Sequence, residues 1–133
     1  MPFARISLHK GKPADYLRSL SDSLHQALNE TFGMPLKDRF QIIHQLEPGE
    51  LVYDPDYLGG PRSANFVLIA LDIGRERDAA TKQAFFERLV QRLAEAPGID
   101  PEDVLVQIST SQAEDWSFGG GRQGIGAPAT SAS

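Results

Sequence analysis

The stretches GMPLKD at residues 33–38 and GIDPED at residues 98–103 decide the fold, because they occur at the same point of two similar units. The glycine that opens each stretch follows apolar residues at helical spacing, and the aspartate that ends each stretch precedes an apolar run. The two glycines and the two aspartates are each 65 positions apart. The chain is therefore predicted to contain two copies of one strand–helix–strand unit.

The first unit begins with residues 3–8, where apolar and other side chains alternate as in a half-buried strand. A helix is predicted from Pro13, which suits a first helical turn, to Gly33, which suits the position just after a helix. Residues 40–46 (FQIIHQL) are predicted to form the second strand. The apolar stripe of the helix comprises Leu17, Leu20, Leu24, Ala27 and Leu28.

The second unit begins with residues 66–71 (FVLIAL), a continuous apolar run typical of a strand that is covered on both faces. Asp78 is the predicted N-cap of a second helix, which Gly98 is expected to close. Residues 104–108 are predicted to form the fourth strand. The stripe of this helix comprises Phe85, Phe86, Leu89, Val90 and Leu93.

Two tandem β-α-β units predict an α+β fold, with a four-stranded sheet and both helices on one face. The right-handed crossover rule makes the two strands of each unit parallel. The other face of the sheet would expose apolar side chains, so we expect self-association. Residues 1–133 are predicted to form a single domain: a first repeat at about 2–47, a connecting loop at 48–63, a second repeat at about 64–110 and an irregular C-terminal segment at 111–133.

The amino-acid composition limits the classes of function that the protein can have. The chain has 133 residues, and a hydrophobic share of 41% is enough for a substantial core. A net charge of −5 argues against a nucleic-acid partner. The absence of cysteine excludes disulfides and thiolate metal sites. Neither a signal peptide nor an apolar span of ~20 residues is present, so we expect a cytoplasmic protein with no membrane partner.

The first candidate functional group is Pro2. If Met1 is removed, Pro2 carries a free secondary amine, whose proton exchanges near neutral pH (the reference α-amino pKa is about 7.7–8.0) and whose nitrogen can attack a carbonyl. The alternative is that Pro2 merely begins the chain. Asp38, which follows the first helix and its turn, is either a functional carboxylate or a turn residue like Asp103.

Arginine and aromatic side chains supply the other candidates. Arg75 and Arg77 follow the third strand and could grip a carboxylate by paired hydrogen bonds, or form a solvated loop with their acidic neighbours. Trp116 and Phe118 form either a satellite core or the wall of an apolar pocket. The histidines have no metal-ligand spacing, and the glycines at 119–121 precede no helix, so neither a metal site nor a phosphate loop is predicted.

Three stretches carry a resemblance to a known family: PLKDRFQ at 35–41, GGPRSAN at 59–65 and EDWSFG at 114–119. Together with Pro2 and the two β-α-β units, they resemble the tautomerase superfamily, and within it most closely the malonate semialdehyde decarboxylases. The resemblance extends to about Gly121. Beyond it, RQGIG at 122–126 lacks the bulky residues that usually continue the family pattern, which leaves substrate size and specificity open.

The resemblance implies a cofactor-free site that binds a small carboxylate, in a homotrimer. Pro2, freed of Met1, would be the catalytic amine, and Asp38 would act on water or set the charge state of that amine. The pair Arg75 and Arg77 would bind the substrate carboxylate and polarise its carbonyl, with the division of labour open. Trp116 and Phe118 would form the apolar wall.

Three functions follow as hypotheses. The first is decarboxylation of a small 3-oxo acid such as malonate semialdehyde. The second is a tautomerase or hydratase, with dehalogenase-like chemistry included, acting on 2-oxo or unsaturated acids, because these reactions need the same acid–base amine and carboxylate clamp. The third is a signalling or structural homologue without catalysis, which retention of Met1 would favour.

Overall fold

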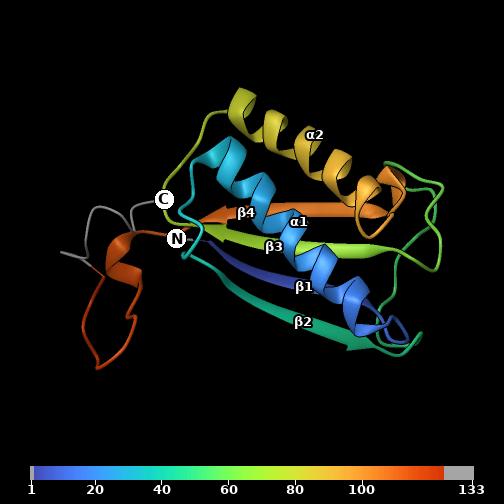
Figure 1. Ribbon diagram of the computed structural model, residues 1–133, viewed down its shortest axis with the longest axis horizontal. Coiled ribbons are helices and arrows are strands. Elements are labelled where there is room, and N and C mark those ends of the chain that lie inside the picture. The colour runs from blue at the N-terminus through green and yellow to red at the C-terminus, as the bar shows by residue number, and fades with distance from the viewer. Residues whose placement is uncertain (1, 125–133) are drawn as a thin grey trace.

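The computed structural model describes residues 2–124; Met1 and residues 125–133, the last part of the segment predicted to be irregular, lie outside the described residues. Figure 1 shows one layer of two helices packed on one face of a four-stranded sheet, which confirms the predicted α+β fold. The elements in chain order are β1 (Phe3–His9), α1 (Ala14–Phe32), β2 (Phe40–Leu46), β3 (Val67–Ile73), α2 (Ala79–Glu95), η1 (Pro101–Asp103), β4 (Val104–Thr110) and η2 (Ala113–Asp115).

The sheet has the strand order β2-β1-β3-β4. The strands of each predicted unit are parallel neighbours, β1 with β2 and β3 with β4, and the two units meet through an antiparallel β1–β3 pair. This arrangement places the first residues of β1 and β2 at the same end of the sheet as the last residues of β3 and β4. Figure 1 shows this end at the left.

Local chemistry accounts for the helix ends. Gly33 adopts φ 70 and its N–H donates to Asn29, as expected for a glycine that ends α1. The Asp78 carboxylate caps α2 by accepting from the Thr81 N–H at 2.8 Å. Helix α2 ends at Glu95, earlier than Gly98, because Pro97 has no N–H to donate and disfavours helical backbone at the residue before it.

The core lies between the helices and the sheet face that they cover. The helices pack on each other as well, and on their outer side the Glu30 carboxylate of α1 accepts hydrogen bonds from Arg88 and Arg92 of α2. The largest fully buried side chains are Phe66, Phe85, Ile6, Leu20, Leu24, Leu28, Met34, Ile69, Leu71, Ile73, Leu89 and Leu93.

The far end of the sheet is fastened by Asp103. Its backbone N–H donates to the Asp100 carbonyl at 2.9 Å and closes a turn, as expected, but its carboxylate has a further role. Its buried carboxylate accepts from the Ser63 N–H and from the Ser63 hydroxyl, each at 2.6 Å. Asp100 caps the short η1 helix in its place. The register between the repeats was therefore predicted correctly, but Asp103 fastens the long loop before β3.

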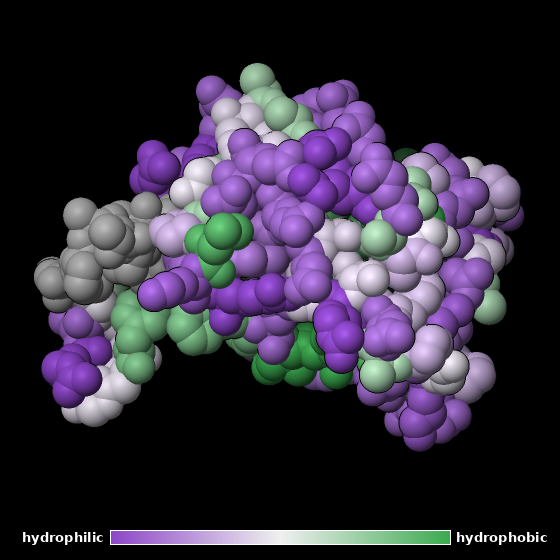
Figure 2. Space-filling model, in the orientation of Figure 1, coloured by the Kyte–Doolittle hydropathy of each residue, from purple (hydrophilic) through white to green (hydrophobic). Residues whose placement is uncertain are grey.

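The second face of the sheet is open within residues 2–124. Residues of β3 alternate between buried and half-buried, so this chain covers only one face of the strand that was expected to be covered on both. Phe40 and Ile42 of β2 are 50% and 44% exposed. Figure 2 shows apolar surface along the lower edge of the molecule, over β2. Within the described residues, no helix is long and apolar enough to cross a membrane.

Candidate active site

Strand register brings the predicted site segments to one end of the sheet. Phe3, the residue after Pro2, lies beside Phe40 of β2 and beside Asp72 of β3. Pro2 is buried at the start of β1. The turn before β2, the loop after β3 and the segment after β4 therefore all approach the residue that precedes β1. Phe3 and Trp116, which are 113 positions apart in the chain, meet here.

Asp38 is buried at this end, with 8% of its surface exposed. Its backbone N–H donates to the Pro35 carbonyl at 3.0 Å, which closes the turn that joins α1 to β2. The next residue, Arg39, binds Ser21 and Asp22 of α1 through its guanidinium. The turn is thus fixed against the helix, and Asp38 is held in the protein interior beside the start of the sheet.

A histidine without a predicted role supports the same turn. His25 of α1 is buried, and its Nε2 donates to the Leu36 carbonyl at 2.7 Å. A single histidine among polar neighbours in sequence gave no sign of this contact. The spacing of three residues between His25 and Leu28, which belongs to the apolar stripe of the helix, was the available signal that the ring borders the interior.

The two arginines have different surroundings. Arg77 is half-buried: its guanidinium donates to the Phe32 carbonyl at 3.0 Å and to the Arg75 carbonyl, and it lies 5.1 Å from the centre of the Phe32 ring. Arg75 is exposed, and its guanidinium makes no hydrogen bond or ion pair within residues 2–124. Within the same residues neither guanidinium forms an ion pair with an acidic neighbour: the Glu76 carboxylate binds Lys82 and accepts from the Arg77 backbone N–H, and the Asp78 carboxylate caps α2.

Electrostatics favours an anion near this loop. Burial lowers the pKa of Arg77 from its ordinary value, and the positive charge of Arg75 lowers it further, while the Glu76 carboxylate acts in the opposite direction. The Arg77 guanidinium keeps its positive charge at neutral pH all the same, because arginine is not deprotonated in proteins. Two cations that repel each other are stabilised by a carboxylate between or beside them. The loop after β3 therefore suits an anionic ligand.

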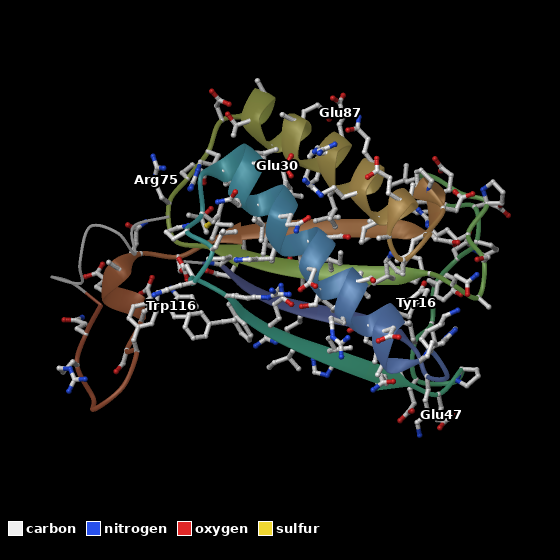
Figure 3. The ribbon with its side chains drawn as sticks, in the orientation of Figure 1. Tyr16, Glu30, Glu47, Arg75, Glu87 and Trp116 are labelled. Atoms are coloured by element: carbon white, nitrogen blue, oxygen red, sulfur yellow. The ribbon has the colours of Figure 1, made fainter. Side chains whose placement is uncertain are left out.

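An aromatic cluster completes this end of the sheet. The rings of Trp116 and Phe118 stack at 5.5 Å with an interplanar angle of 8°. The Trp116 ring meets Phe3 edge-on at 6.4 Å, and Phe118 lies 6.4 Å from Phe40. Figure 3 shows Trp116 and Arg75 at the same end of the molecule. Phe3 and Phe40 were missed as candidates, because a strand alternation does not show which of its aromatics will meet a distant segment.

A hollow of about 330 Å³ adjoins the cluster on the open face of the sheet. Trp116 and Phe3 form its apolar side, and Arg5 and Asp72 contribute charge. Pro2, Asp38, Arg75 and Arg77 do not line it. The hollow and the aromatic cluster thus share Trp116 and Phe3, the residue that directly follows Pro2.

Sequence comparison defines the class of protein. Residues 38–119 match one family of tautomerase enzymes, and residues 2–61 match another family of the same description. The chain belongs to the tautomerase superfamily, in agreement with the fold and with the resemblance drawn from its motifs.

Individual relatives show which members of the superfamily the chain is similar to. The chain is 36% identical to the probable tautomerase YusQ of Bacillus subtilis (strain 168), over 92% of this chain and 96% of the relative. It is 37% identical to a solved malonate semialdehyde decarboxylase described as having decarboxylase and hydratase activities, with a TM-score of 0.83 over 90% of this chain and 92% of the other. A second solved malonate semialdehyde decarboxylase, inhibited by 3-bromopropiolate, is 32% identical with a TM-score of 0.83, over 90% and 91% of the two chains.

Proposed function

We propose that this protein is a cofactor-free decarboxylase of a small 3-oxo acid such as malonate semialdehyde, and that Pro2 supplies the catalytic amine. One observation carries the proposal: the register of the sheet gathers the start of β1, the buried Asp38, the arginine loop and the aromatic cluster at one end. The identity of 37% to a malonate semialdehyde decarboxylase over nearly the whole chain supports the choice of substrate.

In this proposal Asp38 controls the charge of the Pro2 amine. A buried carboxylate raises the pKa of a nearby amine, whereas apolar surroundings lower it. Asp38 and the aromatic cluster of Trp116 and Phe118 therefore act in opposite directions on the amine. The balance sets how much ammonium is available near neutral pH.

The arginines divide their work in this proposal. Arg75 has an exposed guanidinium, so it grips the substrate carboxylate. The guanidinium of Arg77 donates two of its hydrogen bonds to the Phe32 and Arg75 carbonyls. Arg77 therefore holds the loop in place and adds positive charge. The contacts of the two arginines thus support this division of the roles, which the sequence left open.

Decarboxylation needs an acceptor for the electron pair of the bond that breaks. As the bond between the methylene and the carboxylate carbon breaks and carbon dioxide leaves, the pair moves toward the carbonyl of the substrate. The Pro2 amine stabilises it either as an ammonium that donates to the carbonyl oxygen, or as an iminium formed after loss of water. Protonation of the resulting enol or enamine carbon gives acetaldehyde from malonate semialdehyde, and hydrolysis releases Pro2 on the second route.

Turnover assays test the function. Purified protein is offered malonate semialdehyde, phenylenolpyruvate and an acetylenic acid, and decarboxylation is expected to be the fastest reaction. A matched chain with a short N-terminal extension has its Pro2 nitrogen locked in an amide and should be inactive. If the extended protein is still active, Pro2 is not part of the mechanism. The proposal also requires that mass spectrometry of the native protein finds Met1 absent.

Borohydride distinguishes the two routes. Reduction in the presence of substrate, followed by peptide mapping, gives an adduct on Pro2 if an iminium forms. Consistent absence of the adduct during full turnover leaves the ammonium route.

A tautomerase or hydratase is the second candidate. The probable tautomerase relative and the hydratase activity of the solved decarboxylase favour it. The same amine, carboxylate and cationic loop serve proton transfer and addition of water. A decarboxylation rate far below the rate with phenylenolpyruvate or an acetylenic acid selects this candidate.

Assembly as a homotrimer is part of the proposal. The open face of the sheet carries exposed Phe40 and Ile42, and the resemblance implies three copies around it. Sedimentation equilibrium should give three times the chain mass of 14.6 kDa. A monomer at micromolar concentration refutes this assembly.

A further inference from the structure

A chain of hydrogen bonds ties the only tryptophan of the protein to the sheet. The indole N–H of Trp116 donates to the Ser111 hydroxyl at 2.7 Å. The Ser111 hydroxyl in turn donates to Oδ1 of Asp72 at 2.6 Å. The Ser109 hydroxyl donates to the other oxygen of Asp72 at 3.2 Å.

The direction of these bonds is fixed by chemistry. An indole N–H only donates, so the Ser111 oxygen must accept from it, and the single hydroxyl proton of Ser111 is left for Asp72. A carboxylate acceptor gives stronger hydrogen bonds than a neutral one. Asp72 therefore holds the Ser111 hydroxyl in the one orientation that presents its lone pairs to Trp116.

The two anchoring residues lie in rigid parts of the fold. Asp72 belongs to β3 and is the register partner of Ser109 in β4. Ser111 directly follows β4, and its N–H donates to the Ile73 carbonyl at 3.0 Å. Trp116 follows the short η2 helix outside the sheet. The relay of hydrogen bonds from Trp116 through Ser111 to Asp72 therefore connects a peripheral segment to the central strand β3 and the end of the edge strand β4.

We propose that Ser111 and Asp72 are positioning residues that set the plane of Trp116 and thereby the width of the apolar wall of the substrate site. This inference rests on the proposed function for its effect on substrate, because Trp116 and Phe118 form that wall only if the site is the one described above. The stacking of Trp116 on Phe118, at 8° between planes, transmits the orientation of the indole to the second ring.

Nuclear magnetic resonance reads the relay directly. Because Trp116 is the only tryptophan, a ¹⁵N-labelled sample gives one indole cross-peak in the folded protein. Ser111→Ala should move this peak upfield and speed its exchange with water at least tenfold. Ser111→Thr keeps a hydroxyl and should restore it in part. Asp72→Ala should also move the peak, although Asp72 does not contact the indole.

Ser109→Ala is the matched control, because it removes a hydroxyl from Asp72 and leaves the indole bond intact. In Ser109→Ala the position of the indole cross-peak and its rate of exchange with water should stay close to those of the unmodified protein. In kinetics, Ser111→Ala should raise KM by roughly three- to tenfold, the effect of one hydrogen bond, and change kcat by less than about threefold. Ser109→Ala should change both by less than about twofold.

The outcomes separate the relay from the proposed function. An unchanged indole peak in Ser111→Ala overturns the relay, even if the protein is an active decarboxylase. A moved peak with an unchanged KM shows a tether that does not shape the substrate site, and overturns the inference. A moved peak in a protein that turns over none of the tested acids leaves the tether standing and removes the proposed function.

Discussion

Replacing each arginine of the loop after β3 should separate substrate binding from stability. Arg77 makes two hydrogen bonds to carbonyls and lies over the Phe32 ring, whereas Arg75 is exposed. We therefore expect Arg75→Ala to impair catalysis in a stable protein. Arg77→Ala should impair both stability and catalysis, because it releases the loop that carries Arg75.

The magnitudes follow from the contacts. Two half-exposed hydrogen bonds at about 1 kcal/mol each and a cation–π contact of about 0.5 kcal/mol make Arg77 worth roughly 2.5 kcal/mol of stability. At roughly 4 °C for each kcal/mol in a chain of this size, the Tm should fall by roughly 10 °C. Arg75→Ala should shift the Tm by less than about 2 °C, as at other exposed sites. Its loss of charge-assisted bonds to the substrate should lower kcat/KM by roughly 10- to 100-fold.

Calorimetry and steady-state kinetics on the same samples measure both effects. Arg77→Lys is the control for charge: it keeps the cation, but a lysine cannot reach both carbonyls with the fork geometry of arginine, so most of the loss in Tm should remain. The division of roles is refuted if Arg75→Ala lowers the Tm by the amount expected for Arg77→Ala. It is also refuted if Arg77→Ala leaves the Tm unchanged.

Three further predictions concern carboxylates. Asp38→Asn should lower kcat roughly 100-fold with little change in KM if Asp38 sets the charge of the amine; wild-type kcat would mean that Asp38 only shapes its turn. Glu30 has a pKa below its ordinary value because of the hydrogen bond from Arg88, so its stabilisation is present above about pH 4.3 and is lost as the pH falls through the lower native pKa. The Tm of Glu30→Gln should accordingly lie below that of the wild type at pH 7 and converge with it in acid, and a constant gap would exclude this linkage. Asp103→Ala should lower the free energy of unfolding, measured in urea, by roughly 2–4 kcal/mol, because Ser63 loses two hydrogen bonds to a buried carboxylate. At low temperature its kcat should stay unchanged, because this contact lies at the far end of the sheet from the candidate site.

The repeat and its secondary structure could be predicted from sequence because they depend on local chemistry. Alternation at residues 3–8 and the glycine and proline signals around residue 33 act over a few neighbours, and Gly33 and Asp78 end and begin their helices as expected. The 65-residue register between the two units then implied the parallel pairs. The motifs at 35–41 and 114–119 carried the family, and with it a set of candidate residues.

Contacts between distant segments required the tertiary structure. The sequence could not separate Arg75 from Arg77, because the carbonyl that holds Arg77 belongs to Phe32 at the end of α1. It missed the contact of the Asp103 carboxylate, because the partner Ser63 is 40 positions away. The tie from Trp116 through Ser111 to Asp72 joins three segments that no local pattern relates. Local periodicity thus determined what the elements are, while strand register decided which side chains meet at the end of the sheet.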